Sequence, residues 1–400
     1  MNRLARNTLA LYAAQFTVRL FNIIVIVLIG RQLGPADLGR FSFVMATVSF
    51  VHLFAVGGLN NWLVREVART PARTPALLTR ALTINLLLAT LGTLAVWSAT
   101  LVPEFNADPL RTLCLRLFIP SVFFSATAET IFAIFDGHQD MRFRAVLVSI
   151  RAGSRALICG LLIAGLRNLP SLFAGYLIIE LAVVILAGWL TYRRFGKPPL
   201  PTGQLDRQVI AELLPFFITS LLLLVDSRVH IWIITAVQGN VAAGQFSAAH
   251  GLILAVLLLP GAVTNAAFPQ LAQMTDTSRV FFQKLLRWIT AAGILAGIGL
   301  FLGAGLFLQL FFGDRYLDAT PTLRILALTL PAGFINGALL SWLYATHRQT
   351  RVLYLTVATT TICVIASWFL VHHLGYVGAA WAALGTELLQ LSLFAWACRP

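Results

Sequence analysis

Long apolar runs alternate with short polar connections along the whole of this 400-residue chain. A helix that spans a membrane needs about 20 mostly apolar residues, and twelve runs approach or reach that length. They cover residues 9–29, 41–61, 81–101, 113–135, 145–166, 170–190, 213–236, 243–268, 287–311, 322–345, 352–371 and 377–397. The pattern predicts an all-α polytopic membrane protein with about twelve transmembrane helices.

Two short segments of the chain are similar to each other. The sequence GPADLGRFS at residues 34–42 corresponds to GNVAAGQFS at residues 239–247, an offset of 205 residues. At the same offset, Asn60 corresponds to Asn265. Each half contains six runs, an even number, so both copies enter the membrane from the same side. The sequence therefore predicts two parallel six-helix repeats, the arrangement of transporters whose two halves rock about a central site.

The connection at residues 192–212 is the longest polar segment and is rich in proline and glycine. Such a composition is typical of a linker. We therefore expect an N-terminal six-helix bundle at residues 1–191, a cytoplasmic linker at 192–212, and a C-terminal six-helix bundle at 213–400.

Composition and charge placement support a membrane protein and predict its orientation. Hydrophobic residues make up 58% of the chain and charged residues 11%, whereas a soluble domain has about 25% charged residues. If the N-terminus is cytoplasmic, 20 of the 29 basic residues lie on the cytoplasmic side, 7 on the other side and 2 inside spans. The positive-inside rule then places both termini in the cytoplasm. Anionic lipid headgroups account for the net charge of +14, so we expect membrane lipids as partners and no nucleic acid.

The two arginines inside spans are the first candidates for function, because a charge buried in a membrane is costly and seldom lacks a role. Arg19 lies in the first run and Arg228 in the seventh, 209 residues apart. Relative to the repeat offset they differ by one helical turn, so they occupy the same face of equivalent helices. Because arginine binds phosphate bidentately, a cavity with both would suit a diphosphate. Alternatively, Arg228 pairs with Asp226 or another buried acid and only holds helices together.

Other polar residues within the spans extend this candidate set. The expected cavity residues are Asn22, His52, Asn60, His250 and Asn265. Asn60 and Asn265 have a second interpretation, as hydrogen-bonding contacts between helices. Glu129 is either a coupling site for a proton or cation, or an ion-pair partner of Arg151 or Arg155. Asp226 is likewise either a coupling site or an ion-pair partner, in its case of Arg228.

The sequence contains no signal for an enzyme. It has neither a P-loop nor a G-x-S-x-G motif, and no connection is long enough for a catalytic domain. The four cysteines lie in or beside apolar runs without a C-x-x-C pattern, so we expect no metal site. We also expect no cofactor, and transport energy must come from the membrane potential, an ion gradient or the substrate gradient.

Several short motifs, in this order and spacing, resemble those of a known family. They are GRQLGP at residues 30–35, REVAR at 65–69, GQFSAA at 244–249, LFFGDRY at 310–316 and GYVGAA at 375–380. The chain resembles the Wzx-type polysaccharide flippases of the multidrug/oligosaccharidyl-lipid/polysaccharide exporter superfamily. This resemblance implies two six-helix bundles in a V shape around a central cavity. It also implies a bacterial inner membrane and a polyprenyl-diphosphate-linked oligosaccharide that is moved to the periplasmic leaflet.

The resulting interpretation is a flippase that works by alternating access, with Arg19 and Arg228 attracting the diphosphate. Polysaccharide polymerase and assembly proteins would be its partners. The alternatives are a cation-coupled multidrug exporter of the same superfamily and a scaffold within a polysaccharide assembly complex. The arginines count against the exporter, which needs an acidic, aromatic cavity. A scaffold would export glycan normally after both arginines were replaced.

Overall fold

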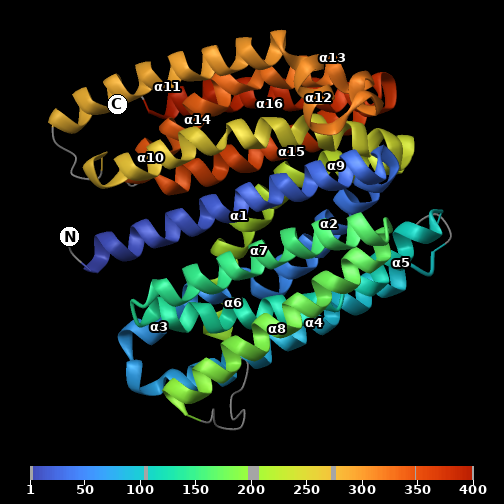
Figure 1. The fold of residues 1–400 in the computed structure, drawn as a ribbon. Coiled ribbons are helices and arrows are strands. Elements are labelled where there is room, and N and C mark those ends of the chain that lie inside the picture. The colour runs from blue at the N-terminus through green and yellow to red at the C-terminus, as the bar shows by residue number, and fades with distance from the viewer. Residues whose placement is uncertain (1–2, 103–106, 197–206, 272–275, 347, 399–400) are drawn as a thin grey trace. The chain divides into compact units, whose positions relative to one another are not determined.

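A computed structural model describes residues 3–102, 107–196, 207–271, 276–346 and 348–398 of the chain (Figure 1). Within these ranges the regular structure is entirely helical, as the apolar runs predicted. The contacts between residues divide the chain into two compact units. One comprises the residues up to Val25 together with Val44–Leu224, and the other comprises Ile26–Phe43 together with the residues from Val225 onward.

The first unit holds most of the N-terminal helices. They are the beginning of α1 (Arg3–Leu33), most of α2 (Pro35–Val56), α3 (Leu59–Arg69), the short η1 (Pro71–Arg73), α4 (Thr74–Ala99), α5 (Pro109–Phe118), α6 (Ser121–Gly137), α7 (Met141–Gly165), α8 (Leu169–Phe195) and the start of α9 (Arg207–Val256). Helix α6 packs against α3, α4, α7 and α8, and its buried face lies at the centre of this unit.

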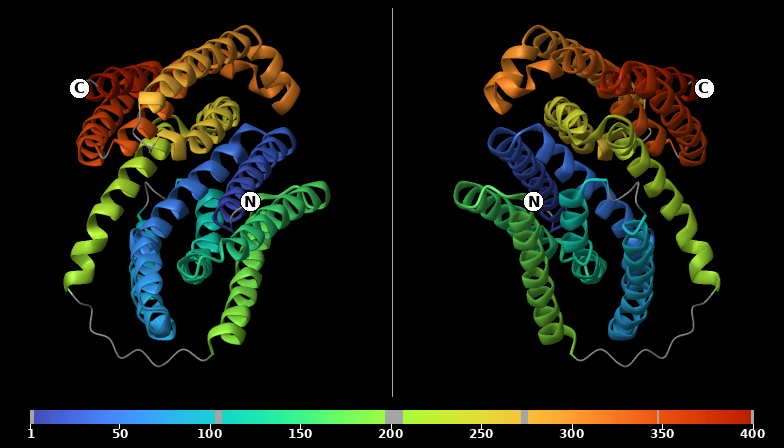
Figure 2. Two further views of the ribbon diagram at one scale, coloured as in Figure 1. Left: turned by 90° about the vertical axis from the view of Figure 1, so that its left-hand side faces the viewer. Right: turned by 90° about the vertical axis from the view of Figure 1, so that its right-hand side faces the viewer.

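The second unit contains the remaining helices. They are the end of α1, the beginning of α2, the rest of α9, α10 (Leu258–Leu271), α11 (Asp276–Leu302), α12 (Ala304–Phe312), η2 (Asp314–Ala319), α13 (Thr320–Ala327), α14 (Thr329–Ala345), α15 (Gln349–Leu374) and α16 (Tyr376–Ala397). Helix α14 packs against α11 and α16, and α15 packs against α16; Figure 2 shows these C-terminal helices from two sides. The predicted boundary at residues 192–212 stays a prediction, and residues 197–206 of it lie outside the described residues.

In the described part of the chain, ten helical segments are long and apolar enough to span a membrane. An eleventh arises if the pair Asp314–Ala327 and Thr329–Ala345, bent by 42°, is one span. The segment Phe217–Gly261 covers two of the predicted runs, and Gly239 interrupts it with a non-helical φ of 81°. The structure is therefore consistent with about twelve transmembrane helices, and the chain is a multi-pass membrane protein.

Local sequence signals explain where several helices begin and bend. The carboxylate of Asp108 caps α5 by accepting a hydrogen bond from the backbone N–H of Arg111 at 2.9 Å, and Asn168 caps α8 in the same way. Helix α5 ends just before Pro120, and α13 ends shortly before Pro331. Proline removes a backbone hydrogen bond and clashes with the preceding turn, so it ends or bends these helices.

Candidate functional site

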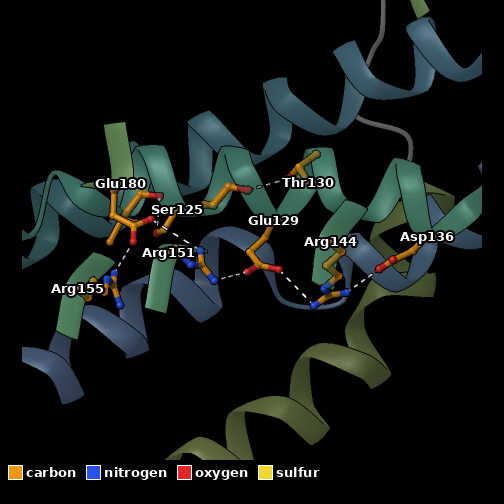
Figure 3. Close-up of polar contacts among 10 residues, drawn as sticks. Ser125, Glu129, Thr130, Asp136, Arg144, Arg151, Arg155 and Glu180 are labelled. Atoms are coloured by element: carbon orange, nitrogen blue, oxygen red, sulfur yellow. Dashed lines mark hydrogen bonds and ion pairs between the residues drawn. The ribbon is translucent and has the colours of Figure 1, made fainter. Parts of the chain in front are cut away.

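Six charged side chains in the first unit form a continuous chain of ion pairs across three adjacent helices (Figure 3). We call this set the ion-pair ladder; in order it consists of Asp136, Arg144, Glu129, Arg151, Glu180 and Arg155. The acids come from α6 and α8, and all three arginines come from α7. The ladder therefore contains three positive and three negative charges, which balance one another.

The sequence spacing brings these groups onto facing helix surfaces. Arg144, Arg151 and Arg155 are seven and four residues apart, and Glu129 and Asp136 are seven apart. Residues at these spacings lie on one face of a helix. The face of α7 that carries the guanidinium groups therefore meets the face of α6 that carries the carboxylates.

At one end of the ladder, Arg144 bridges two carboxylates of α6. Its Nη1 lies 2.6 Å from Oδ2 of Asp136, and its Nη2 lies 3.3 Å from Oε2 of Glu129. The other carboxylate oxygen of Glu129 accepts a hydrogen bond from Arg151 at 2.9 Å. The ion-pair interpretation of Glu129 is thus present in the structure, with a second partner that the sequence did not suggest.

At the other end, the carboxylate of Glu180 on α8 is fully buried and faces two arginines. Arg155 donates a hydrogen bond to Oε1 of Glu180, and Nη1 of Arg151 lies 3.7 Å from Oε2. Arg155 therefore pairs with Glu180 and not with Glu129. A buried carboxylate without such partners would be strongly unfavourable, so the ladder fixes how α6, α7 and α8 pack.

Residues on other helices of this unit lie around the ladder. His52 on α2 is half-buried and interacts electrostatically with Glu129 and Arg151. The side-chain oxygen of Asn60 on α3 is buried and has no hydrogen-bond partner among the described residues. Arg19 and Asn22 on α1 have exposed side chains. Of these predicted cavity residues, the structure brings His52 to the ladder.

His138 follows the end of α6 in the connection to α7 and has a well-defined environment. One of its ring nitrogens lies 3.0 Å from the hydroxyl of Thr74, and its ring stacks on Phe195. Burial and the neighbouring Arg194 cation lower the pKa of this imidazole below its ordinary value. Both effects favour the neutral form of His138 at this end of the unit.

Arg228 on α9 is a cation of the second unit that has no ion-pair partner among the described residues. Its side chain is half-buried, and in the part of the chain that the structure describes it makes no hydrogen bond or ion pair. The alternative that Arg228 pairs with Asp226 is not observed among the described residues; Asp226 lies near the thiol of Cys363 instead. The reason is helical geometry, because residues two apart point away from each other on a helix.

A group of polar and aromatic residues in this unit includes His250, which lies near Arg228. His250 lies close enough to Arg228 and His230 for electrostatic interaction, and its ring stacks on Phe246 with centroids 5.5 Å apart. His230 is buried and pairs with the hydroxyl of Ser367 at 3.0 Å. Sequence reasoning missed Ser367 and Cys363, because small neutral side chains in an apolar run give no signal of proximity.

The side chain of Asn265 lies outside the described residues. Among the residues that the structure does describe, no group of three or more histidine, cysteine, aspartate or glutamate side chains could hold a metal ion.

Comparisons with known proteins agree with this architecture. The profile of the family described as "Polysaccharide biosynthesis protein" matches residues 4–275. A protein of Escherichia coli K12 named "Putative O-antigen transporter" is 24% identical over 98% of this chain and 95% of its own length. The lipid II flippase MurJ in an inward closed conformation superposes with a TM-score of 0.81 at 14% identity, covering 96% of this chain and 86% of that one.

A second solved structure places the fold in a wider group. An inward-facing multidrug resistance MATE family transporter of the MOP superfamily superposes with a TM-score of 0.74 at 15% identity, covering 95% of this chain and 93% of that one. At such identities the similarity shows the fold alone. The chain thus has the helical fold of the MOP superfamily transporters.

Proposed function

Because this chain belongs to the polysaccharide biosynthesis protein family, we propose that it is a bacterial inner-membrane flippase. Its substrate would be a polyprenyl-diphosphate-linked oligosaccharide, moved from the cytoplasmic to the periplasmic leaflet by alternating access. The similarity to a protein named as an O-antigen transporter and the fold shared with a lipid II flippase support this class of substrate.

The observation that carries the proposal is the state of Arg228. In the first unit, each arginine of the ladder has a carboxylate partner, whereas Arg228 has no partner among the described residues. A half-buried guanidinium in a membrane-spanning helix is costly unless it meets an anion. Its planar fork suits a phosphate oxygen pair, so the diphosphate of the substrate is the anion that we propose for it.

Arg19 is the proposed second contact for the anionic group. Its side chain is exposed and makes no ion pair within the described ranges. His250 beside Arg228, and His52, Asn22 and Asn60 in the first unit, would supply hydrogen bonds to the glycan. The polyprenyl tail would stay in the lipid, because about 0.8 kcal/mol opposes the exposure of each methylene group to water.

The ladder bears on the alternative of a cation-coupled exporter. Glu129 is engaged by two arginines, so we do not propose it as a coupling site. Asp226 has no ion pair within the described residues. Of the two candidate coupling acids, Glu129 and Asp226, it is the one that remains. An exporter of cationic drugs requires unpaired acids near the substrate, and the unpaired cation Arg228 favours an anionic substrate instead.

The test is the export of surface glycan in cells that lack the protein, restored with wild type or with variants at matched expression. We expect Arg228→Ala and Arg19→Ala each to lower the rate of export by about 10- to 100-fold, the size of a lost hydrogen bond to a charged group. Arg228→Lys keeps the charge and loses the bidentate geometry, so we expect an intermediate rate.

Arg287→Ala is the matched control, since it removes an exposed arginine from α11 and should leave export unchanged. Normal export in the double variant Arg19→Ala, Arg228→Ala would refute the role of the arginines and favour a scaffold. A wild-type protein that restores no glycan but lowers drug accumulation would establish the exporter instead.

A further inference from the structure

Within the second unit, the start of α2 meets α9 with no side chain between the two backbones. A Cβ atom added to Gly39 would lie 1.8 Å from the carbonyl oxygen of Asn240, and one added to Gly244 would lie 1.8 Å from the carbonyl oxygen of Pro35. No side chain fits in either place. We call these four residues the glycine seal.

The two contacts of the glycine seal are equivalent, as if related by a two-fold axis. Gly39 and Gly244 are 205 residues apart in the sequence, and so are Pro35 and Asn240. Each glycine therefore contacts the repeat equivalent of the residue that its counterpart contacts, which is the pattern of an isologous interface. The two most similar segments of the chain thus pack against each other, which explains why small residues recur at both positions.

Each half of the glycine seal follows a turn that requires glycine. Gly34 has a φ of +91° between α1 and α2, and Gly239 has a φ of +81° inside α9. Residues with side chains rarely adopt this conformation. The seal glycines come five residues after these turns in both halves, so each half offers a turn about which its seal can move.

Within the second unit, a segment from the C-terminal half contacts the end of α1. We call residues 310–316, which comprise the end of α12, Gly313 and the start of η2, the strap. The hydroxyl of Tyr316 donates a hydrogen bond to the carbonyl oxygen of Gly30 at 3.2 Å, and Arg31 donates one to the carbonyl oxygen of Leu310 at 3.2 Å. Gln245, next to the glycine seal, donates to the carbonyl oxygen of Arg315 at 2.8 Å.

We propose that the glycine seal is a gate at one end of the translocation path and that the strap holds it closed. A contact between two backbones cannot stretch, so α2 and α9 are either joined at the glycines or apart. Such a two-state contact is what alternating access requires. The inference rests on the proposed function, and it adds which residues open and close and why both halves must move together.

The experiment measures how readily a reagent reaches a residue behind the glycine seal. Ser247 lies one turn beyond Gly244 and is buried; Ser247→Cys is introduced in a chain whose four native cysteines are replaced. The labelling rate with a polar maleimide is measured on protein in lipid nanodiscs, where both faces of the membrane are accessible. Gly39→Val and Gly244→Val should each raise this rate about tenfold or more, and equally, because the contact is reciprocal.

Two further variants make the result decisive. Gly299→Val is the control, because a Cβ on this helical glycine would meet nothing within 4 Å, and labelling should not change. Tyr316→Phe removes one hydrogen bond of the strap and leaves the glycines intact, so labelling should rise about fivefold. If either glycine variant fails to fold, Tyr316→Phe alone decides.

Labelling that stays at the wild-type rate in Tyr316→Phe and in the folded glycine variants would overturn the proposal. A rise in Gly299→Val as large as the rise in Gly39→Val and Gly244→Val would overturn it as well. This readout needs no glycan. A normal response to the variants in a protein that does not restore glycan export would therefore refute the flippase and leave the gate standing. If the protein restores glycan export but its labelling rate does not change in the variants, the gate is refuted and the flippase stands.

Discussion

A single acidic side chain shows how this protein tolerates charge inside a membrane. Glu180 has no exposed surface and faces Arg155 and Arg151. Removing one partner of a buried ion pair leaves the other charge uncompensated, which costs more than the pair itself contributes. The ladder is thus a unit whose members depend on one another, because each inner charge has two neighbours of opposite sign.

The variant Glu180→Gln tests this dependence. It keeps the shape of the side chain but leaves Arg155 without a counter-charge, so we expect a loss of about 3–5 kcal/mol in the free energy of unfolding. Thermal unfolding of the purified protein in nanodiscs would show it as a lower melting temperature.

The matched control is Glu66→Gln in α3, where the carboxylate meets Arg65 and Arg69 at 3.5 Å near the surface. Such a pair contributes about 0–1 kcal/mol. Equal destabilisation by the two substitutions would show that the ladder is no stronger than a surface pair.

At the scale of elements, close packing of helices relies on glycines at particular points. On α8, a Cβ added to Gly175 would lie 2.7 Å from a methyl carbon of Ile158 on α7, whereas one added to Gly188 would meet nothing within 4 Å. In a membrane, where lipid is as apolar as the helix surface, helices associate largely through such close contacts. One glycine of α8 thus has a packing role that the other lacks.

We therefore expect Gly175→Val to destabilise the protein by about 1–3 kcal/mol, the usual cost of overpacking. Gly188→Val makes the same chemical change in the same helix and should leave stability nearly unchanged. Unfolding of both variants in parallel is the measurement. Similar effects on the two would indicate that the change in helix propensity, and not the contact with α7, controls stability.

At the scale of the whole molecule, the distribution of charge predicts how the chain is inserted. Loops with many arginines stay in the cytoplasm, so the 20-to-7 distribution of basic residues in the sequence predicts that both termini lie there. The turn at Gly34 would then face the periplasm, and the glycine seal would close the periplasmic end of the path. The distribution of basic residues thus predicts both the orientation of the chain and the side of the membrane on which the proposed gate lies.

Reporter fusions test this orientation. A fluorescent protein fused after Pro400 should be fluorescent, because it folds in the cytoplasm, while alkaline phosphatase inserted after Asp314 should be active, because it folds in the periplasm. The reverse pattern would contradict the positive-inside assignment and move the proposed gate to the cytoplasmic end.

The sequence by itself determined the helical membrane architecture and the match between the two glycine-containing segments. Apolar runs of about 20 residues span lipid as helices, in which every backbone group is satisfied within the segment. The sequence also offered Arg151 or Arg155 as an ion-pair partner of Glu129, and the structure shows that it is Arg151. The apolar runs and the matching segments are local properties, and the order of residues is enough to derive them.

Only the tertiary structure decided which charges meet. Arg155 pairs with Glu180 on α8, while Arg228 makes no ion pair with any described residue although Asp226 is two residues away. The reciprocal contact of Gly39 with Gly244 likewise depends on how α2 crosses α9. Pairing across helices depends on their rotation and depth, which follow from the packing of all neighbours together and are not encoded in the spacing within any single helix.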